Sequence, residues 1–290
     1  MTLRSKTLLA VLFGSVLSFR LWAAADGGEP STWQMRSLVP RSDPRVRISG
    51  GWFVLGSGDG ELARAKALCG GSSKAAEVCD PKQFAAERPA RRSFVRAFGI
   101  DREEVSNQSY RSCVRAGACV PPRDPDVEPP ANFPVVQLTF AEARTYCRFV
   151  GGDLPTEAQW EYAAHGSSER SFPWGQVWNP QLATAAKPDA GLSPVDANPD
   201  GKSFFGLLNM AGNVWEFVLD AYRAPYDAAL PAVDPVALPA ETAGIRGGEH
   251  VLRGGSFRSP PHMLRARYRA PIRDDEARSD VGLRCAYAAR

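Results

Sequence analysis

The residues of this chain best suited to chemistry are its six cysteines, because thiolates bind metals, attack electrophiles and form disulfides. None of them has the two-residue spacing typical of zinc and redox sites, and only three histidines accompany them. Metal binding by a thiolate cluster is therefore the weaker reading. An even number of cysteines in an exported chain instead indicates disulfides, although the residues alone leave the pairing open. The cysteines are Cys69, Cys79, Cys113, Cys119, Cys147 and Cys285, and the histidines are His165, His250 and His262.

Two other patterns that could carry chemistry are weak. The glycine-rich run from Gly56 to Gly60 follows a strand-like segment, as phosphate-binding loops do, but it lacks the third glycine at the required spacing. We therefore expect no nucleotide site there. No Gly-x-Ser-x-Gly sequence occurs, so a Ser-His-Asp hydrolase has no starting point.

Two helices that could position such residues are marked by their caps. Thr139 and Glu142 form a capping box ahead of apolar residues at helical spacing, and glycines at 151 and 152 end this helix. Thr156 and Gln159 form a second capping box, for a helix that stops near Gly166. Residues 48–56 resemble a short strand, and 56–92 an irregular insertion. The remaining short apolar runs, broken by Gly, Pro and Asn, predict an irregular mixed fold.

The N-terminus is typical of a secretory signal peptide. Arg4 and Lys6 precede an apolar run, residues 8–19, that is too short for a stable bilayer anchor, and three alanines at 23–25 suit signal peptidase. An uncleaved anchor is the alternative. We predict a secreted or periplasmic protein with no membrane span after cleavage. The expected organisation is a signal peptide over 1–25, a flexible leader over 26–44 and one domain over 45–290.

Composition and charge exclude some partners. A hydrophobic content of 44% and a charged content of 23% are ordinary for a globular protein with a real core. The chain has 35 basic and 32 acidic residues, and the predicted signal peptide contains three basic and no acidic ones, so the mature chain carries 32 of each. This balance indicates neither nucleic acid nor an anionic membrane as a partner.

Seven segments stand in a characteristic order along the chain. They are Gly51–Ser57 (GWFVLGS), Ile100–Tyr110 (IDREEVSNQSY), Asp153–Ala164 (DLPTEAQWEYAA), Phe172–Gly175 (FPWG), Gly206–Phe217 (GLLNMAGNVWEF), Arg253–Phe257 (RGGSF) and Gly282–Cys285 (GLRC). In sequence and order they resemble the segments of the formylglycine-generating, or sulfatase-modifying factor, family. The resemblance covers roughly residues 48 to 288, too much for chance. It implies a large α+β domain, irregular and low in regular secondary structure, related to the C-type lectin-like fold.

The resemblance also raises a chemical question, because the family's copper enzymes use two cysteines shortly after the GGSF segment. Thiolates suit Cu(I), which activates dioxygen. By spacing, Ser259 and either Leu264 or Arg265 occupy these two positions here, and prolines at 260 and 261 alter the loop. We therefore expect no copper, and no conversion of sulfatase cysteines to formylglycine. The family also includes pyoverdine-maturation and ergothioneine-synthase oxidases, so another oxidoreductase chemistry stays open.

The matching segments imply a pocket whose residues remain even without the cysteine pair. By match it contains Trp215, Ser256, Asp280 and Arg284, with Arg258, Ser259, His262 and Arg267 as neighbours. We assign no catalytic residue from the sequence. We interpret the chain as an exported, catalytically divergent member of the family whose pocket binds a peptide or small ligand, or supports a partner protein. A divergent oxidoreductase using non-copper chemistry is the alternative, and whether the chain is an enzyme stays open.

The GLLNMAGNVWEF segment implies one structural calcium ion. By resemblance its ligands are the side chains of Asn209 and Glu216 and the carbonyls of Gly212 and Val214, hard oxygen donors of the kind that calcium prefers. The alternative is that Glu216 is a buried, paired carboxylate. A second family site is not expected, because Thr184 stands where that site needs an asparagine.

The resemblance also implies how the cysteines pair. Cys147 on the first capped helix would bond Cys285 near the C-terminus, closing most of the domain into one loop. The remaining four would then pair locally, as Cys69 with Cys79 and Cys113 with Cys119.

Overall fold

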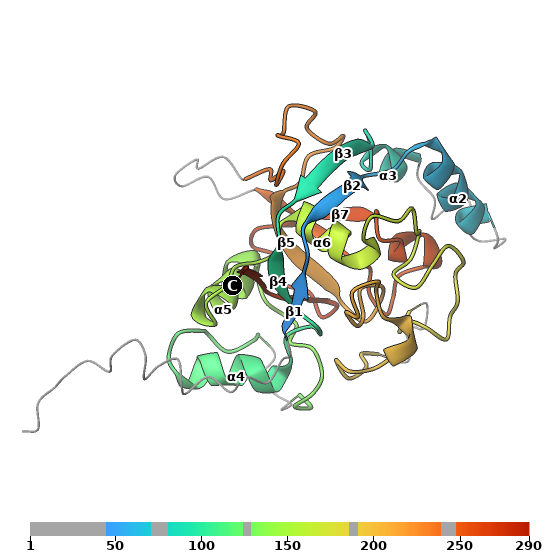
Figure 1. Cartoon of the computed structure of the whole chain (residues 1–290). Coiled ribbons are helices and arrows are strands. Elements are labelled where there is room, and N and C mark those ends of the chain that lie inside the picture. Colours follow the sequence, from blue (N-terminus) through green and yellow to red (C-terminus); the bar gives the residue numbers. More distant parts are fainter. Residues whose placement is uncertain (1–44, 71–80, 124–128, 186–190, 239–247, 290) are drawn as a thin grey trace, which may run out of the picture. The chain divides into compact units, whose positions relative to one another are not determined.

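The computed structural model describes residues 45–70, 81–123, 129–185, 191–238 and 248–289, which form an irregular assembly of short helices and strands (Figure 1). The helices are α2 (Asp59–Gly70), α3 (Pro81–Ala85), α4 (Asn107–Arg115), α5 (Phe140–Phe149) and α6 (Glu157–His165), with 3-10 turns η3 (Pro199–Gly201) and η4 (Pro261–Leu264). The strands are β1 (Arg45–Ile48), β2 (Gly51–Leu55), β3 (Arg91–Val95), β4 (Phe98–Asp101), β5 (Trp215–Ala221), β6 (Glu249–Arg253), β7 (Arg269–Arg273), β8 (Val281–Gly282) and β9 (Ala286–Ala288).

Both helices predicted from capping boxes are present. In α5 the Thr139 side chain accepts a hydrogen bond from the Glu142 backbone N–H and the Glu142 carboxylate accepts one from Thr139. Thr156 and Gln159 make the same reciprocal pair at the start of α6, which ends at Gly166. The segment predicted as an irregular insertion instead contains α2 and α3. The Ala, Leu, Arg and Lys residues of α2 have high intrinsic helix propensity, which outweighs its lack of clear periodicity.

The strands form three small sheets rather than one continuous layer. β1, β4 and β9 make a three-stranded sheet, and β2 pairs with β3. The third sheet has the order β7-β6-β5-β8, and within it only β5 and β8 run parallel. β6 is almost wholly buried and β5 nearly so, and α6 packs against β2, β3, β5 and β6. This arrangement confirms the predicted mixed fold low in regular structure.

Two large apolar clusters and two smaller ones form the core of the described residues. One of the large clusters surrounds α4, α5 and β5 and includes Tyr110, Tyr146, Phe217 and Leu283. The other lies around α6 and β2 to β4, and its members include the fully buried Trp160. Because α6 touches two of the three sheets, burial of its side chains joins the sheets through a common core.

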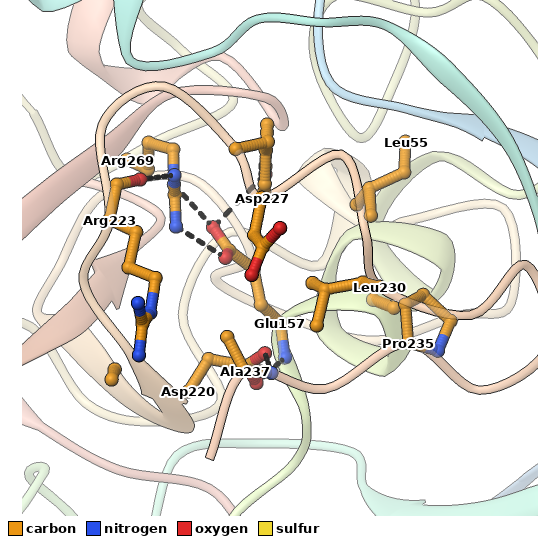
Figure 2. Close-up of a pocket in the computed structure, with 12 residues that line it drawn as sticks. Leu55, Glu157, Asp220, Arg223, Asp227, Leu230, Pro235, Ala237 and Arg269 are labelled. Atoms are coloured by element: carbon orange, nitrogen blue, oxygen red, sulfur yellow. Dashed lines mark hydrogen bonds and ion pairs between the residues drawn. The ribbon is translucent and has the colours of Figure 1, made fainter. Parts of the chain in front are cut away.

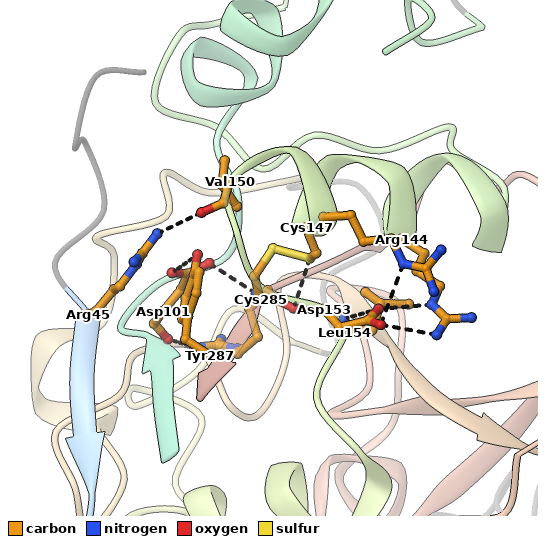
Figure 3. Close-up of a disulfide and its surroundings, with 11 residues drawn as sticks. Arg45, Asp101, Arg144, Cys147, Val150, Asp153, Leu154, Cys285 and Tyr287 are labelled. Carbon is orange, nitrogen blue, oxygen red and sulfur yellow. Dashed lines mark hydrogen bonds and ion pairs between the residues drawn. A yellow bond between two sulfur atoms is a disulfide. The ribbon is translucent and has the colours of Figure 1, made fainter. Parts of the chain in front are cut away.

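The predicted long-range disulfide is confirmed and lies inside the first cluster (Figure 3). Cys147 of α5 bonds Cys285, 138 residues later, with the two Cα atoms 5.3 Å apart. Asp101 reinforces the join, since its carboxylate accepts hydrogen bonds from the Cys285 N–H (2.9 Å) and the Tyr287 hydroxyl (2.8 Å). The C-terminal strand is thereby tied to the middle of the chain.

Of the two predicted local disulfides, only one lies wholly within the described residues. Cys113 and Cys119 form the predicted local disulfide. Cys79 lies outside the described residues, so its pairing with Cys69 stays a prediction. The predicted signal peptide and leader also lie outside them. Of the helices that are described, none has the length and apolar character needed to span a membrane.

Candidate ligand-binding site

The ends of the four-stranded sheet bring three distant segments to one open cavity of about 660 Å³. Trp215, the first residue of β5, donates its backbone N–H to the carbonyl of Asp280 (2.9 Å), just before the parallel strand β8. Ser256 follows the last residue of β6 by three positions, in a turn with Gly254 and Gly255 at positive φ. The pairing of β5 with both β6 and β8 therefore places these side chains together.

The floor of the cavity is a closed set of polar contacts. The Ser256 hydroxyl donates to Asp280 Oδ2 (2.9 Å), and Ser259 Oγ accepts from the Ser256 backbone N–H (2.9 Å). Arg278 holds the same aspartate from its Nε and Nη2 atoms, both at 2.9 Å. Asp280 is buried, whereas Arg278 is only half-buried at the edge of the cavity. The carboxylate is thus neutralised and fully engaged within the protein.

One wall of the cavity is aromatic and apolar. The rings of Trp215 and Tyr268 lie 6.0 Å apart at 43°, and Met263, Pro260 and Ala270 extend this surface. The Tyr268 hydroxyl donates to Gln83 Oε1 (3.0 Å), which fixes the ring. A ligand in this cavity would meet both apolar surface and serine hydroxyls, as is usual for small-molecule sites.

The structure brings five of the eight predicted pocket residues to the cavity: Trp215, Ser256, Arg258, Ser259 and Asp280. Arg267 and Arg284 do not line it. Both are buried, and Arg267 donates to the carbonyl of Arg170 (2.8 Å), while Arg284 is paired with Glu216. Sequence matching could not distinguish an arginine that lines the cavity from one buried in the core, because a motif gives the residue type and not the direction of its side chain.

His262 is also placed away from the cavity. Its ring is 2% exposed and packs edge-on against the rings of Phe84 and Tyr268. Burial, together with the nearby Arg265 guanidinium, lowers the pKa of His262 to about 4. A neutral imidazole that does not line the cavity is not suited to acid–base chemistry there.

The sequence reasoning missed several residues that line the cavity. Gln137 comes from the segment before α5, far in sequence from the other lining residues. Its φ is positive, at 64°. Tyr268, Met263 and Arg278 also line the cavity. The sequence could have indicated Arg278 as a cavity residue, since it stands two residues before the predicted Asp280. No sequence feature indicated Gln137.

The positions predicted by spacing to match the cysteine pair of the copper enzymes lie in different surroundings. Ser259 lines the cavity. Leu264 is fully buried in an apolar cluster with Phe172 and Ala211, and it does not line the cavity. Arg265 points to another part of the protein, where its guanidinium pairs with Glu87 and Glu61, the shortest contact being 2.5 Å.

The donors at the cavity do not fit Cu(I). They are hydroxyls, the Gln137 amide, a carboxylate already paired with Arg278, guanidinium groups and one soft donor, the Met263 thioether. The sequence has no cysteine between 147 and 285, and all cysteines of the described part are in disulfides. Without a thiolate, a single thioether among hard donors is not the soft ligand set that a tight Cu(I) site needs.

Three of the predicted calcium ligands lie in the turn that leads into β5, and the fourth, Glu216, is the second residue of that strand. Glu216 is completely buried, and its carboxylate accepts two hydrogen bonds from Arg284 (2.6 and 2.7 Å) and one from Trp160 Nε1 (2.7 Å). Asn209 directs its amide nitrogen to Glu104 Oε2 (2.9 Å), and its φ of 52° suits the left-handed turn. Calcium at this turn would therefore have to share Glu216 with Arg284, and the four-ligand site stays a prediction.

Glu104 is a second buried carboxylate in the same network. Its two oxygens accept hydrogen bonds from the side-chain amides of Asn209 and Asn213, both at 2.9 Å. Burial raises the pKa of Glu104 to about 8. The positive charge of Arg284 lowers this pKa, and the negative charge of Glu216 raises it. In the described part of the chain, no group of three or more His, Cys, Asp or Glu side chains is arranged to hold a metal.

A smaller cavity elsewhere is structural (Figure 2). Its volume of about 10 Å³ has room for at most one water molecule. Glu157 and Arg269 form a two-point ion pair beside it (2.8 and 2.7 Å), and Asp220 accepts hydrogen bonds from the Glu157 and Ala237 backbone N–H groups, each at 2.7 Å. Burial, with Glu157 nearby, raises the pKa of Asp220 to about 7. These contacts join α6, β5 and β7 and leave no space for a ligand.

Comparisons with known proteins bear on the family and the fold of the chain. The sequence profile described as the sulfatase-modifying factor enzyme 1-like domain matches residues 34–289. The formylglycine-generating enzyme of Mycobacterium tuberculosis is 34% identical over 180 residues, which cover 56% of this chain and 60% of that protein. The hercynine oxygenase of Mycolicibacterium smegmatis is 30% identical over 228 residues, 66% of this chain and 53% of that protein. The chain thus spans little more than half the length of these relatives.

A solved structure supports the fold. The structure of PvdO from Pseudomonas aeruginosa superimposes with a TM-score of 0.64 and covers 84% of this chain and 94% of that one. The two sequences are 18% identical, so the likeness shows a shared fold and nothing further.

Proposed function

Since the chain belongs to the sulfatase-modifying factor enzyme 1-like family, we propose that it is a binding member of that family, whose open cavity holds a peptide or small ligand. It has no copper-dependent conversion of sulfatase cysteines. The protein is exported, to the periplasm or outside the cell, after removal of residues 1–25. Its two described disulfides are compatible with an oxidising compartment.

The observation that carries the proposal is the composition of the cavity. A volume of about 660 Å³ is large enough for a small ligand or a peptide side chain with its backbone. Its floor presents Ser259 where the copper enzymes have a cysteine, and the second such position, at Leu264 or Arg265, is buried in other contacts. The concave shape is kept while the thiolate chemistry is absent.

Binding can be tested by blocking the cavity. Ala270, on β7, lines it and is only half-buried at the edge of the first apolar cluster, so Ala270→Trp adds a large side chain at the cavity. Ala141→Trp, on the exposed face of α5, is the matched control. Purified protein is screened against an immobilised peptide library and a fragment library. Hits that bind wild type and the Ala141 variant but not the Ala270 variant support the proposal. Equal binding by all three proteins would place the ligand elsewhere.

An oxidoreductase with other chemistry is the second candidate, and the relative named hercynine oxygenase favours it. The cavity has serine, aspartate and glutamine oxygens that a harder metal accepts more readily than Cu(I) does. Metal analysis of protein purified without chelators separates the two functions. A stoichiometric redox-active metal supports the oxidoreductase, and its absence together with a cavity-dependent ligand supports the binding protein.

A further inference from the structure

The cavity carries one positive charge that its own residues do not neutralise. Asp280 is engaged by Arg278 at two points and by the Ser256 hydroxyl. Arg258 also lines the cavity; its side chain is exposed and lies over the Phe257 ring, 4.8 Å from the centroid. Within the described ranges, no carboxylate forms an ion pair with Arg258. One carboxylate against two guanidinium groups leaves the cavity with a net charge of about +1.

The hydroxyls of Ser256 and Ser259, two of the three serines that line the cavity, supply one further donor between them. Ser256 has a single hydroxyl proton, and it is given to Asp280. In the contact of 3.4 Å between the two serine oxygens only Ser259 can therefore donate, and that distance is long for O–H···O. Of the two protons, that of Ser259 is therefore the one that an incoming acceptor can take at low cost. Ser259 Oγ accepts from the Ser256 N–H, so its orientation is already set.

The acceptor that meets these donors would lie next to apolar surface. Trp215, Tyr268 and Met263 line the same cavity as Arg258 and Ser259. Aromatic rings of this kind bind apolar side chains through burial and stacking. A cationic ligand is disfavoured, because the one acidic group in the cavity is fully occupied.

From these observations we propose that the cavity selects ligands in which a carboxylate stands beside an apolar side chain, such as the free C-terminal residue of a peptide. The carboxylate binds Arg258 and the Ser259 hydroxyl, and the apolar group lies against Trp215 and Tyr268. Among the described residues that line the cavity, a net charge of about +1 suits a singly charged group better than a doubly charged phosphate. The inference rests on the proposed function, namely that the cavity binds ligands at all.

The test compares two probes that differ only in the charged group. N-acetyl-L-phenylalanine and its uncharged amide are titrated into wild-type protein and followed by ligand-observed NMR and calorimetry at one salt concentration. We expect the carboxylate to bind about tenfold more tightly than the amide, since a hydrogen-bonded charge in a partly open site contributes about that much. Arg258→Ala should remove the difference by weakening only the carboxylate, and Arg258→Lys should keep part of it. Arg115→Ala removes the same charge from an exposed position on α4 and should change neither affinity.

The outcomes separate this inference from the proposed function. If wild type binds the carboxylate and the amide with equal affinity, the carboxylate preference is overturned while cavity binding stands. The same holds if Arg258→Ala weakens the binding of both probes equally. Tighter binding of phenyl phosphate than of the carboxylate would overturn the single-charge argument. Failure of both phenylalanine probes in wild type overturns the inference, and the Ala270→Trp library screen then decides independently whether the cavity binds anything.

Discussion

Arg284 holds Glu216 from two sides, with its Nε 2.6 Å from Oε2 and its Nη2 2.7 Å from Oε1. Both side chains are fully buried, and Trp160 of α6 adds a third hydrogen bond to the carboxylate. The guanidinium also donates to the carbonyls of Asp101 and Leu208. This pair joins the C-terminal segment to β5 and α6 at the centre of the domain.

Breaking this pair from one side should be costly. Glu216→Gln leaves Arg284 buried without its countercharge, and we expect the free energy of unfolding to fall by about 3–5 kcal/mol. Asp275→Asn removes a carboxylate from the exposed pair of Arg273 and Asp275 and should cost no more than about 1 kcal/mol. Urea unfolding followed by tryptophan fluorescence measures both. Similar losses in the two variants would show that the buried pair has no special role.

The predicted calcium ion can be tested at the same turn. We expect chelator-treated protein to bind one calcium ion, with a midpoint of thermal unfolding that rises as calcium is added, because the ion binds the folded state. Asn209→Ala removes one predicted ligand and should abolish the rise, whereas Asp275→Asn should keep it. Calorimetry that detects no binding to wild type would mean that Arg284 takes the place of the ion as the partner of Glu216.

The two described disulfides should differ in their contribution to stability. In the chain-entropy model, closing a loop of 138 residues stabilises the fold by about 5 kcal/mol and a loop of six by about 2 kcal/mol. We expect Cys147→Ala/Cys285→Ala to lose correspondingly more stability than Cys113→Ala/Cys119→Ala. Chemical unfolding under non-reducing conditions gives the comparison. An equal loss for both pairs would contradict the loop-length argument.

His262 should make the protein sensitive to acid. Its pKa is about 4 in the folded protein and about 6.5 when unfolded, so between these values the unfolded chain binds the proton and the folded one does not. Stability from this residue is fully present above pH about 6.5 and is lost as the pH falls toward 4, by up to roughly 3 kcal/mol.

Replacing this residue by His262→Phe should flatten the stability curve in that window. A phenyl ring keeps the aromatic contacts with Phe84 and Tyr268, and the change also removes the buried Nε2, which has no hydrogen-bond partner among the described residues. Urea unfolding at several pH values from 4 to 7 measures the slope. Parallel curves for wild type and variant would show that the acid sensitivity arises elsewhere.

Restoring two cysteines should not restore copper chemistry. In Ser259→Cys/Leu264→Cys, only the first thiol lines the cavity, because Leu264 is packed with Phe172 and Ala211. The adjacent prolines at 260 and 261 also stiffen the loop. We expect no tight Cu(I) binding and no aldehyde in a sulfatase-motif cysteine peptide, by mass spectrometry after incubation with copper and reductant. The single variant Ser259→Cys is the control. A gain of activity in the double variant alone would show that the loop keeps the geometry of the copper enzymes.

Local chemistry in the sequence determined a large part of this protein. The capping residues Thr139 and Thr156 predicted two helices correctly, because a cap depends on groups only three residues apart. The ordered motifs identified the family, and through it the disulfide of Cys147 with Cys285. The absence of cysteine at Ser259 could also be read directly from the chain.

Only the tertiary structure decided which polar side chains face the cavity and which pair inside the core. Arg258 and Arg284 both stand in or beside matched motifs, yet one is exposed at the cavity and the other is buried on Glu216. Gln137 reaches the cavity from more than a hundred residues before Asp280. A motif records which residues are present, whereas the direction of a charged side chain depends on which countercharge the folded chain brings within reach, and here those partners are distant in sequence.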